Sequence, residues 1–220
     1  MFDLLRNGFT VQVFINLLVR VFIIFCVLPF HEYAHALLAT KQGDPTAKLS
    51  GRLTLNPLAH IDPIGAVMIF FAGFGYAKPV PVNIRNFKNP KKGMAITALA
   101  GPVSNLLLAF ISIIFMNLVA LISDATIVQV TILFLYYNAV ININLAVFNL
   151  LPIPPLDGSR LLAVILPDKY YYKVMQNERM LMIIILVLIF TGVITRPLMF
   201  LSGAVYKALS VFVGLFFKLF

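Results

Sequence analysis

Charged residues are scarce in this sequence of 220 residues. They make up 11% of the chain, whereas a soluble domain has about 25%, and apolar residues make up 61%. The mean hydropathy of +0.97 agrees with this balance. Such a composition excludes an ordinary soluble domain and indicates a protein embedded in a membrane. No polar stretch is long enough to fold separately, so we expect one membrane-embedded domain over residues 1–220.

Cysteine is almost absent as well. Cys26 is the single cysteine, so no internal disulfide can form, and its apolar surroundings indicate a packing role. The net charge of +9 is not gathered into a stripe that would bind nucleic acid. The basic residues fall between apolar runs, where the positive-inside rule would place them. We therefore expect the lipid bilayer, and no nucleic acid, as the partner of this surface.

Long apolar runs predict an all-α polytopic membrane protein, a bundle of about five to six transmembrane helices. The first span is residues 21–39, about 28 Å of helix, and residues 9–19 either extend it or lie at the interface. Four later runs form two antiparallel helical hairpins. They are 94–123 with 126–151 around Asp124, and 180–194 with 198–220 around Arg196 and Pro197.

Residues 64–77 are apolar for only 14 residues and contain three glycines. This is short for a spanning helix and predicts a segment that enters the membrane and returns. Basic residues flank both of its ends, which places both ends in the cytosol. They are Lys41, Lys48 and Arg52 before it, and Lys78, Arg85, Lys88, Lys91 and Lys92 after it.

Residues 48–55 alternate polar and apolar side chains with period two, the pattern of a half-buried strand. We therefore expect a small re-entrant β element. Its edge either pairs with an extended peptide inside the bilayer, where freed backbone groups need hydrogen-bond partners, or belongs to a structural hairpin that covers a neighbouring site.

His31-Glu32-Tyr33-Ala34-His35 is an HExxH pattern. On a helix, the two imidazoles lie one turn apart and face one zinc ion, and Glu32 lies beside them to take a proton from water. The alternative is a set of buried polar residues that bond to neighbouring helices, but ionisable groups inside a membrane are usually functional. Haem ligation is excluded because two histidines on one helix face cannot approach iron from opposite sides. Three histidines are also too few for a di-iron oxidase.

A catalytic zinc of this type needs a third protein ligand and an open position for water. Asp157 is the best candidate, because three prolines end the preceding helix and force an extended segment that can fold back to a metal. Spacing alone leaves open the alternative that Asp157 is a turn residue before Gly158.

Three elements together resemble the site-2 protease family of intramembrane zinc metalloproteases. They are the HExxH pattern, Gly101-Pro102-Val103-Ser104-Asn105, and the element from Asn149 to Gly158. The resemblance implies that His31, His35 and Asp157 bind the zinc, one Zn²⁺ per chain, and that Glu32 is the general base. It also implies a single-span membrane protein or a signal-peptide remnant as substrate. The chain lacks the PDZ and CBS domains of some members, so it resembles the minimal form, expected in a prokaryotic cell membrane with the active site toward the cytosol.

Five further polar residues are candidates for secondary roles. Asn138, Asn142 and Asn149 share one helical face; we favour interhelical bonds for the first two, whereas Asn149 matches the family element and is a candidate donor to the oxyanion. For Asn105 we favour packing, since small residues nearby allow close helix approach. His60 is either a satisfied loop histidine or a residue of gating or substrate contact.

The predicted function is hydrolysis of peptide bonds within transmembrane segments of membrane-anchored proteins. The alternative is a non-catalytic membrane protein, either a pseudoprotease chaperone or a metal carrier, that keeps the metal ligands. Glu32 argues against this alternative, because a carrier does not require a carboxylate beside the metal.

Overall fold

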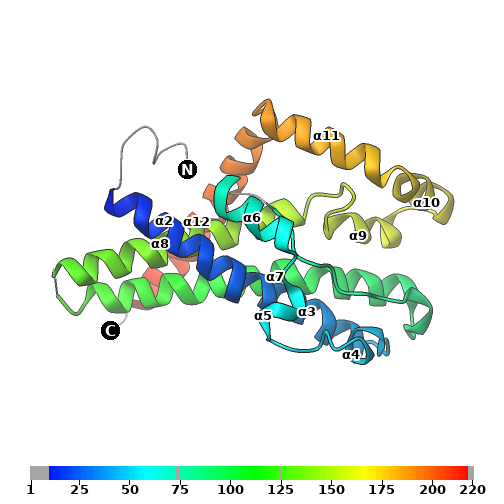
Figure 1. The fold of residues 1–220 in the computed structure, drawn as a ribbon, viewed down its shortest axis with the longest axis horizontal. Helices are drawn as coiled ribbons and strands as arrows, with labels where there is room; N and C mark the ends of the chain where they lie inside the picture. The colour runs from blue at the N-terminus through cyan, green and yellow to red at the C-terminus, as the bar shows by residue number, and fades with distance from the viewer. Residues whose placement is uncertain (1–9, 73–74, 124, 218–220) are drawn as a thin grey trace.

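The computed structural model describes residues 10–72, 75–123 and 125–217, and the regular elements within these ranges are helices (Figure 1). Four helices are long and apolar enough to cross a membrane: Val11–Lys41, Pro90–Ala120 (α7), Thr126–Asn149 (α8) and Thr195–Phe217 (α12). The prediction of an all-α membrane bundle is therefore confirmed. The predicted five to six spans are too many, because the described residues contain four helices of sufficient length.

The first spanning helix is continuous but changes its winding once. It consists of α2 (Val11–Phe22), a π-helical stretch labelled η1 (Ile23–Val27) and α3 (Leu28–Lys41). The π stretch leads directly to Pro29, which has no backbone N–H and whose ring would crowd the carbonyl one turn earlier. The predicted span at 21–39 lies inside this helix, and from Val11 onward the preceding segment extends it. Phe9 lies outside the described residues.

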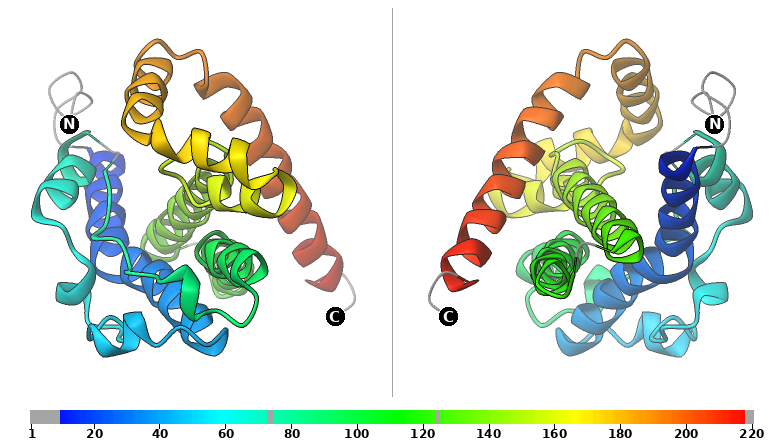
Figure 2. Two further views of the ribbon diagram at one scale, coloured as in Figure 1. Left: turned by 90° about the vertical axis from the view of Figure 1, so that its right-hand side faces the viewer. Right: turned by 90° about the vertical axis from the view of Figure 1, so that its left-hand side faces the viewer.

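The hairpin of α7 and α8 forms the centre of the bundle. Pro90 begins α7, where the Asn89 side chain accepts a hydrogen bond from the Lys92 N–H. Two clusters of buried apolar side chains flank α8. Ile15, Val19, Ile23 and Val27 pack with it on one side, and Ala109, Ile113 and Val213 with Ala139, Ile143 and Val147 on the other. Figure 2 accordingly shows α7 and α8 between α2 and α12. The first predicted hairpin is confirmed; its turn residue Asp124 lies outside the described residues.

The chain returns from α8 to α12 through three shorter helices. They are α9 (Gly158–Ile165), α10 (Asp168–Gln176) and α11 (Glu178–Phe190), of which α10 and α11 form the upper edge of the molecule in Figure 1. The sequence predicts a span at 180–194, but α11 has 13 residues and is about 20 Å long. It ends before Gly192, whose φ of +75° is left-handed and does not continue a helix. Residues 218–220 of the second predicted hairpin lie outside the described residues.

Residues 61–78 leave the bundle and come back to the same place. The segment holds the helix α6 (Pro63–Ala72), about 15 Å long, and the Lys78 N–H then donates to the carbonyl of His60 at 2.8 Å. Nη1 of Arg20 donates to the carbonyl of Phe70 at 2.8 Å and so satisfies a terminal carbonyl of α6. Both ends of this segment therefore lie on one side of the bundle; residues 73 and 74 lie outside the described part.

The expected β element at 48–55 is wrong. Thr46–Leu49 is a short helix (α4), residues 50–56 form turns and bends, and Pro57–His60 is the helix α5. No strand occurs within the described ranges. The apolar residues of the alternating pattern do not form a buried face, since Leu49 and Leu55 are 82% and 56% exposed, whereas Arg52 is buried. Gly51, at a φ of +68°, also interrupts an extended backbone.

Candidate metal centre

Three side chains from distant parts of the sequence converge in the interior. His31 and His35 lie one turn apart on α3, and Asp157 directly precedes α9. The two Nε2 atoms are 3.0 Å apart, and each is 3.3 Å from Oδ2 of Asp157. This is the one group of three or more metal-ligating side chains found among the residues that the structure describes. Ligands about 2.0–2.1 Å from a tetrahedral zinc lie about 3.3 Å apart, so the three separations suit one such ion.

The tautomers of both histidines direct lone pairs to the same point. His35 Nδ1 lies 2.7 Å from the carbonyl oxygen of Thr97, which can only accept, so this nitrogen carries the hydrogen. His31 Nδ1 lies 3.4 Å from Oδ1 of Asn105, another acceptor. Both Nε2 atoms of the neutral rings are therefore lone-pair donors. Oδ2 of Asp157 is a third, buried and without a hydrogen-bond donor among the described residues. Three lone pairs that converge in this way fit a bound cation, and this donor set is one that zinc prefers.

One face of α7 supports the histidines. Thr97, Gly101 and Asn105 are spaced by four residues, so they follow one another along this face. The carbonyl of Thr97 accepts from Nδ1 of His35, and Oδ1 of Asn105 accepts from Nδ1 of His31. Gly101, between them, leaves the space for the rings. A Cβ at Gly101 would lie only 2.5 Å from Nε2 of His31. The bare backbone is therefore what allows α7 to lie directly against the histidine pair.

The position of Asp157 results from the turn that follows α8. The segment 151–157 folds through successive backbone turns, including the bond from the Leu156 N–H to the carbonyl of Ile153 at 3.0 Å. Gly158 then packs on this turn so closely that a Cβ would lie 2.6 Å from the carbonyl oxygen of Leu151. Oδ2 of Asp157 is thereby placed 3.3 Å from Nε2 of each histidine, where it completes the metal-binding group.

Glu32 is held by an extended segment that follows the α6 excursion. The Val80 N–H donates to Oε2 of Glu32 at 3.2 Å, and prolines at positions 79 and 81 leave Val80 as the single backbone donor between Lys78 and Val82. The buried Arg52 guanidinium donates to the carbonyl of Lys78, and to that of Pro79 at 3.1 Å. Arg52 thus fixes the segment whose N–H orients the candidate base.

The remaining predicted residues lie outside the metal-binding group. His60 is fully buried; its Nε2 lies 2.8 Å from the carbonyl oxygen of Thr54, and its Nδ1 has no hydrogen-bond partner among the described residues, so its role stays a prediction. Asn138 donates to Oγ of Ser112 on α7 at 2.8 Å, which is an interhelical bond of the expected kind. Asn142 donates to the carbonyl of Asn138 within α8 at 2.9 Å, so the interhelical bond expected for it does not form with any described residue. Asn149 is the half-buried last residue of α8, and its proposed contact with the oxyanion stays a prediction.

Four of the supporting residues are not among those predicted from the sequence. These are Thr97, Val80, Arg52, and Gly101 as the residue whose missing side chain leaves space for the imidazoles. For the α7 face, the spacing of small and polar residues at 97, 101 and 105 was a usable signal, and Asn105 orients His31 as well as packing. The contacts of Val80 and Arg52 join residues distant in sequence and leave no local pattern.

Comparison with known proteins assigns the family. Residues 115–193 match the model of Peptidase family M50, a range that holds Asp157 but begins after the HExxH pattern. The protein named "Putative zinc metalloprotease YwhC" of Bacillus subtilis is 46% identical over 164 residues, which cover 73% of this chain and 75% of that protein. The chain belongs to peptidase family M50. The resemblance to site-2 proteases is confirmed by this membership.

Two further relatives come from organisms other than Bacillus subtilis. The proteins named "Putative zinc metalloprotease Rip2" of Mycobacterium tuberculosis and "Putative zinc metalloprotease MJ0611" of Methanocaldococcus jannaschii are each 32% identical, over 137 and 134 residues. Each match covers 60% of this M50 chain, and 51% and 63% of the respective relative, so the chain spans about half the length of the mycobacterial protein. None of the solved structures gives a significant match.

Proposed function

We propose that this M50 protein is an intramembrane zinc metalloendopeptidase with one zinc ion per chain, held by His31, His35 and Asp157. The observation that carries the proposal is the convergence of two imidazole lone pairs and one carboxylate beside Glu32. The relatives named above, each called "Putative zinc metalloprotease", support the same chemistry. An HExxH metalloprotease uses this ligand arrangement, with one coordination position open.

Each residue of the site has a defined task in hydrolysis. Bound zinc supplies a Lewis acid that polarises a peptide carbonyl and makes water more acidic. Glu32 accepts the proton of the attacking water and passes it to the leaving amine. The Val80 N–H binds one oxygen of this carboxylate, which restricts its rotation toward the substrate. Thr97 and Asn105 hold the imidazoles in the tautomer that coordinates a metal.

The depth of the histidines supports cleavage within the bilayer. His35 and His31 precede Lys41, the basic end of the first spanning helix, by about 9 Å and 15 Å along the helix axis. A peptide bond that reaches them has to enter the apolar part of the membrane. The substrate class is therefore a membrane-anchored chain, such as a single-span protein or a signal-peptide remnant. From the basic flanks we further propose that the site opens toward the cytosol of a prokaryotic cell.

The substitution Glu32→Gln tests this function, because it removes the base and keeps the side-chain shape and the metal ligands. General acid–base catalysis contributes about 10² to 10⁴ in rate, so turnover should fall at least that far while the zinc content stays at one per chain. Zinc is measured by mass spectrometry of purified protein. Cleavage is measured as loss of single-span fragments from membranes of cells that express wild type but not the variant. Glu178→Gln, the same change at the start of α11, is the matched control and should cleave normally.

Two outcomes would overturn the proposal. If wild type and Glu32→Gln leave identical membrane proteomes while both bind zinc, the protein is a metal carrier or a chaperone that retains the ligands. If purified wild-type protein binds no zinc although it is folded, the three converging side chains are not a metal centre.

A further inference from the structure

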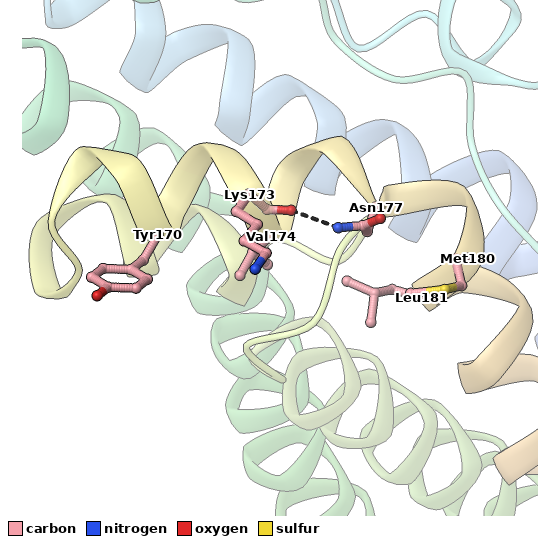
Figure 3. Close-up of a pocket in the computed structure, with 6 residues that line it drawn as sticks. All are labelled: Tyr170, Lys173, Val174, Asn177, Met180 and Leu181. Carbon is pink, nitrogen blue, oxygen red and sulfur yellow. Dashed lines mark hydrogen bonds between the residues drawn. The ribbon is translucent and has the colours of Figure 1, made fainter.

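A shallow pocket lies where α10 meets α11, away from the metal-binding group. It has a volume of about 270 Å³ and is lined by Tyr170, Lys173, Val174, Asn177, Met180 and Leu181 (Figure 3). Tyr170, Lys173 and Val174 lie on one face of α10, and Asn177, the residue that directly follows the helix, comes one turn after Lys173. The last two continue the same face into α11. The pocket is therefore built from one side of a helical elbow.

The lining of this pocket is polar at one end and apolar at the other. Lys173 contributes an exposed ammonium group, which is in no ion pair with any residue that the structure describes. Asn177 is also exposed, and its Nδ2 donates to the carbonyl of Lys173 at 2.8 Å, which satisfies a carbonyl in the last turn of α10. Met180 and Leu181 form the apolar end, beside the start of the apolar helix.

The acidic residues nearby do not neutralise this end of the pocket. Asp168 is engaged by Nζ of Lys91, at 2.7 Å, at the other end of α10. Glu178 follows Asn177 in sequence but does not line the pocket. Lys173 is therefore the charged side chain that a ligand in this pocket would meet.

The location of the elbow in a membrane follows from its two helices. On α11, Ile183 and Val187 are 60% and 55% exposed, and such apolar side chains in a membrane protein face lipid tails. On α10, Tyr171 is buried toward the bundle, while Tyr170 and Tyr172 are 59% and 61% exposed, as tyrosines are at the headgroup level. The elbow thus marks the boundary between headgroups and tails.

We propose that this pocket binds the headgroup of an anionic glycerophospholipid. Nζ of Lys173 meets the phosphate, the Tyr170 hydroxyl donates to a phosphate or glycerol oxygen, and the start of an acyl chain lies over Met180 and Leu181. An amphipathic ligand of this class matches the charge at one end of the pocket and the apolar surface at the other. This site is independent of proteolysis, because none of its residues belongs to the metal-binding group.

Native mass spectrometry of the purified full chain, with phosphatidylglycerol or phosphatidylcholine added in detergent, tests the proposal. Wild type should retain phosphatidylglycerol over phosphatidylcholine. Lys173→Gln should weaken retention of phosphatidylglycerol about fivefold, the equivalent of about 1 kcal/mol for one basic residue near the membrane surface. Asn177→Asp keeps the side-chain shape but adds a negative charge beside Lys173, and it should weaken retention at least as much. Lys48→Gln removes an exposed lysine on α4 and is the matched control, for which no change is expected.

Inorganic phosphate separates a lipid site from a simple anion site. Millimolar phosphate should not displace the lipid, because phosphate lacks the part that covers Met180 and Leu181. Displacement by phosphate would overturn the lipid assignment. Equal loss of phosphatidylglycerol from Lys173→Gln and Lys48→Gln would show that positive charge attracts lipid without a site, and this too would overturn the proposal. Circular dichroism of each variant confirms that the helices are retained.

Discussion

Substitution of Gly101 by alanine tests the close approach of α7 to the histidines. The added Cβ would lie 2.5 Å from Nε2 of His31, whereas unstrained carbon and nitrogen atoms stay about 3.5 Å apart. Relief of this overlap requires a shift of about 1 Å, but ligand distances in a zinc site tolerate only about 0.2 Å. The helix cannot easily move away, because its neighbouring residues Ala98 and Pro102 are themselves buried.

We expect Gly101→Ala to weaken zinc binding by about 10- to 100-fold and to abolish cleavage. Overpacking of a tight interior costs about 1–3 kcal/mol, which corresponds to a similar factor. Zinc affinity is measured by competition with a chelator in detergent. Gly203→Ala in α12 is the matched control, since nothing lies within 4 Å of its added Cβ, and it should keep full affinity. Wild-type zinc affinity in Gly101→Ala would show that α7 does not lie this close to the histidine pair.

Three further predictions concern the supports of the site. Asn105→Ala should weaken zinc binding about 10- to 100-fold in the same chelator competition, because His31 loses the partner of its Nδ1. Asn117→Ala is the control and should not weaken it, because the Asn117 side chain bonds to the carbonyl of Ile113 within α7. Arg52→Gln should reduce kcat with unchanged zinc content, because the segment that orients Glu32 loosens; unchanged kcat in cleavage assays would contradict this role. Burial acts to raise the pKa of Asp44, but its hydrogen bonds lower it more, so its stabilisation is complete above the ordinary value of 3.8 and is lost as the pH falls below it. Asp44→Asn should therefore lower the Tm at pH 7, through loss of about 1–3 kcal/mol, and this difference should shrink below pH 4; a constant difference would refute it.

The metal ligands on α3 were predictable because their spacing along one helix itself indicates the chemistry. Two histidines four residues apart on an apolar helix leave few alternatives to a shared metal. The sequence alone did not establish Asp157 as a ligand, because the prolines before it indicated an extended segment but not the direction in which that segment runs. Its position beside His31 depends on the packing of Gly158 on the preceding turn, which is a contact in space.

The strand expected at 48–55 shows where periodicity misleads. An alternating pattern indicates a strand only if a partner strand and a buried face exist, and within the described residues this segment has neither. Arg52, a polar position of the pattern, points inward because the carbonyls of Lys78 and Pro79 bind it. Likewise, hydropathy alone did not reveal that α11 would stop before Gly192.

The π stretch at Ile23–Val27 sets the rotational phase of the two halves of the first helix. Ile15, Val19, Ile23, Val27, His31 and His35 recur at every fourth residue and are all buried. In an unbroken α-helix such a row winds about 200° around the axis between Ile15 and His35, which would turn the histidines away from the bundle that holds Ile15. A π turn contains more residues than an α turn, so each residue rotates less around the axis and part of this rotation of about 200° is cancelled. One row of side chains can therefore pack against the bundle in its first half and coordinate a metal in its second.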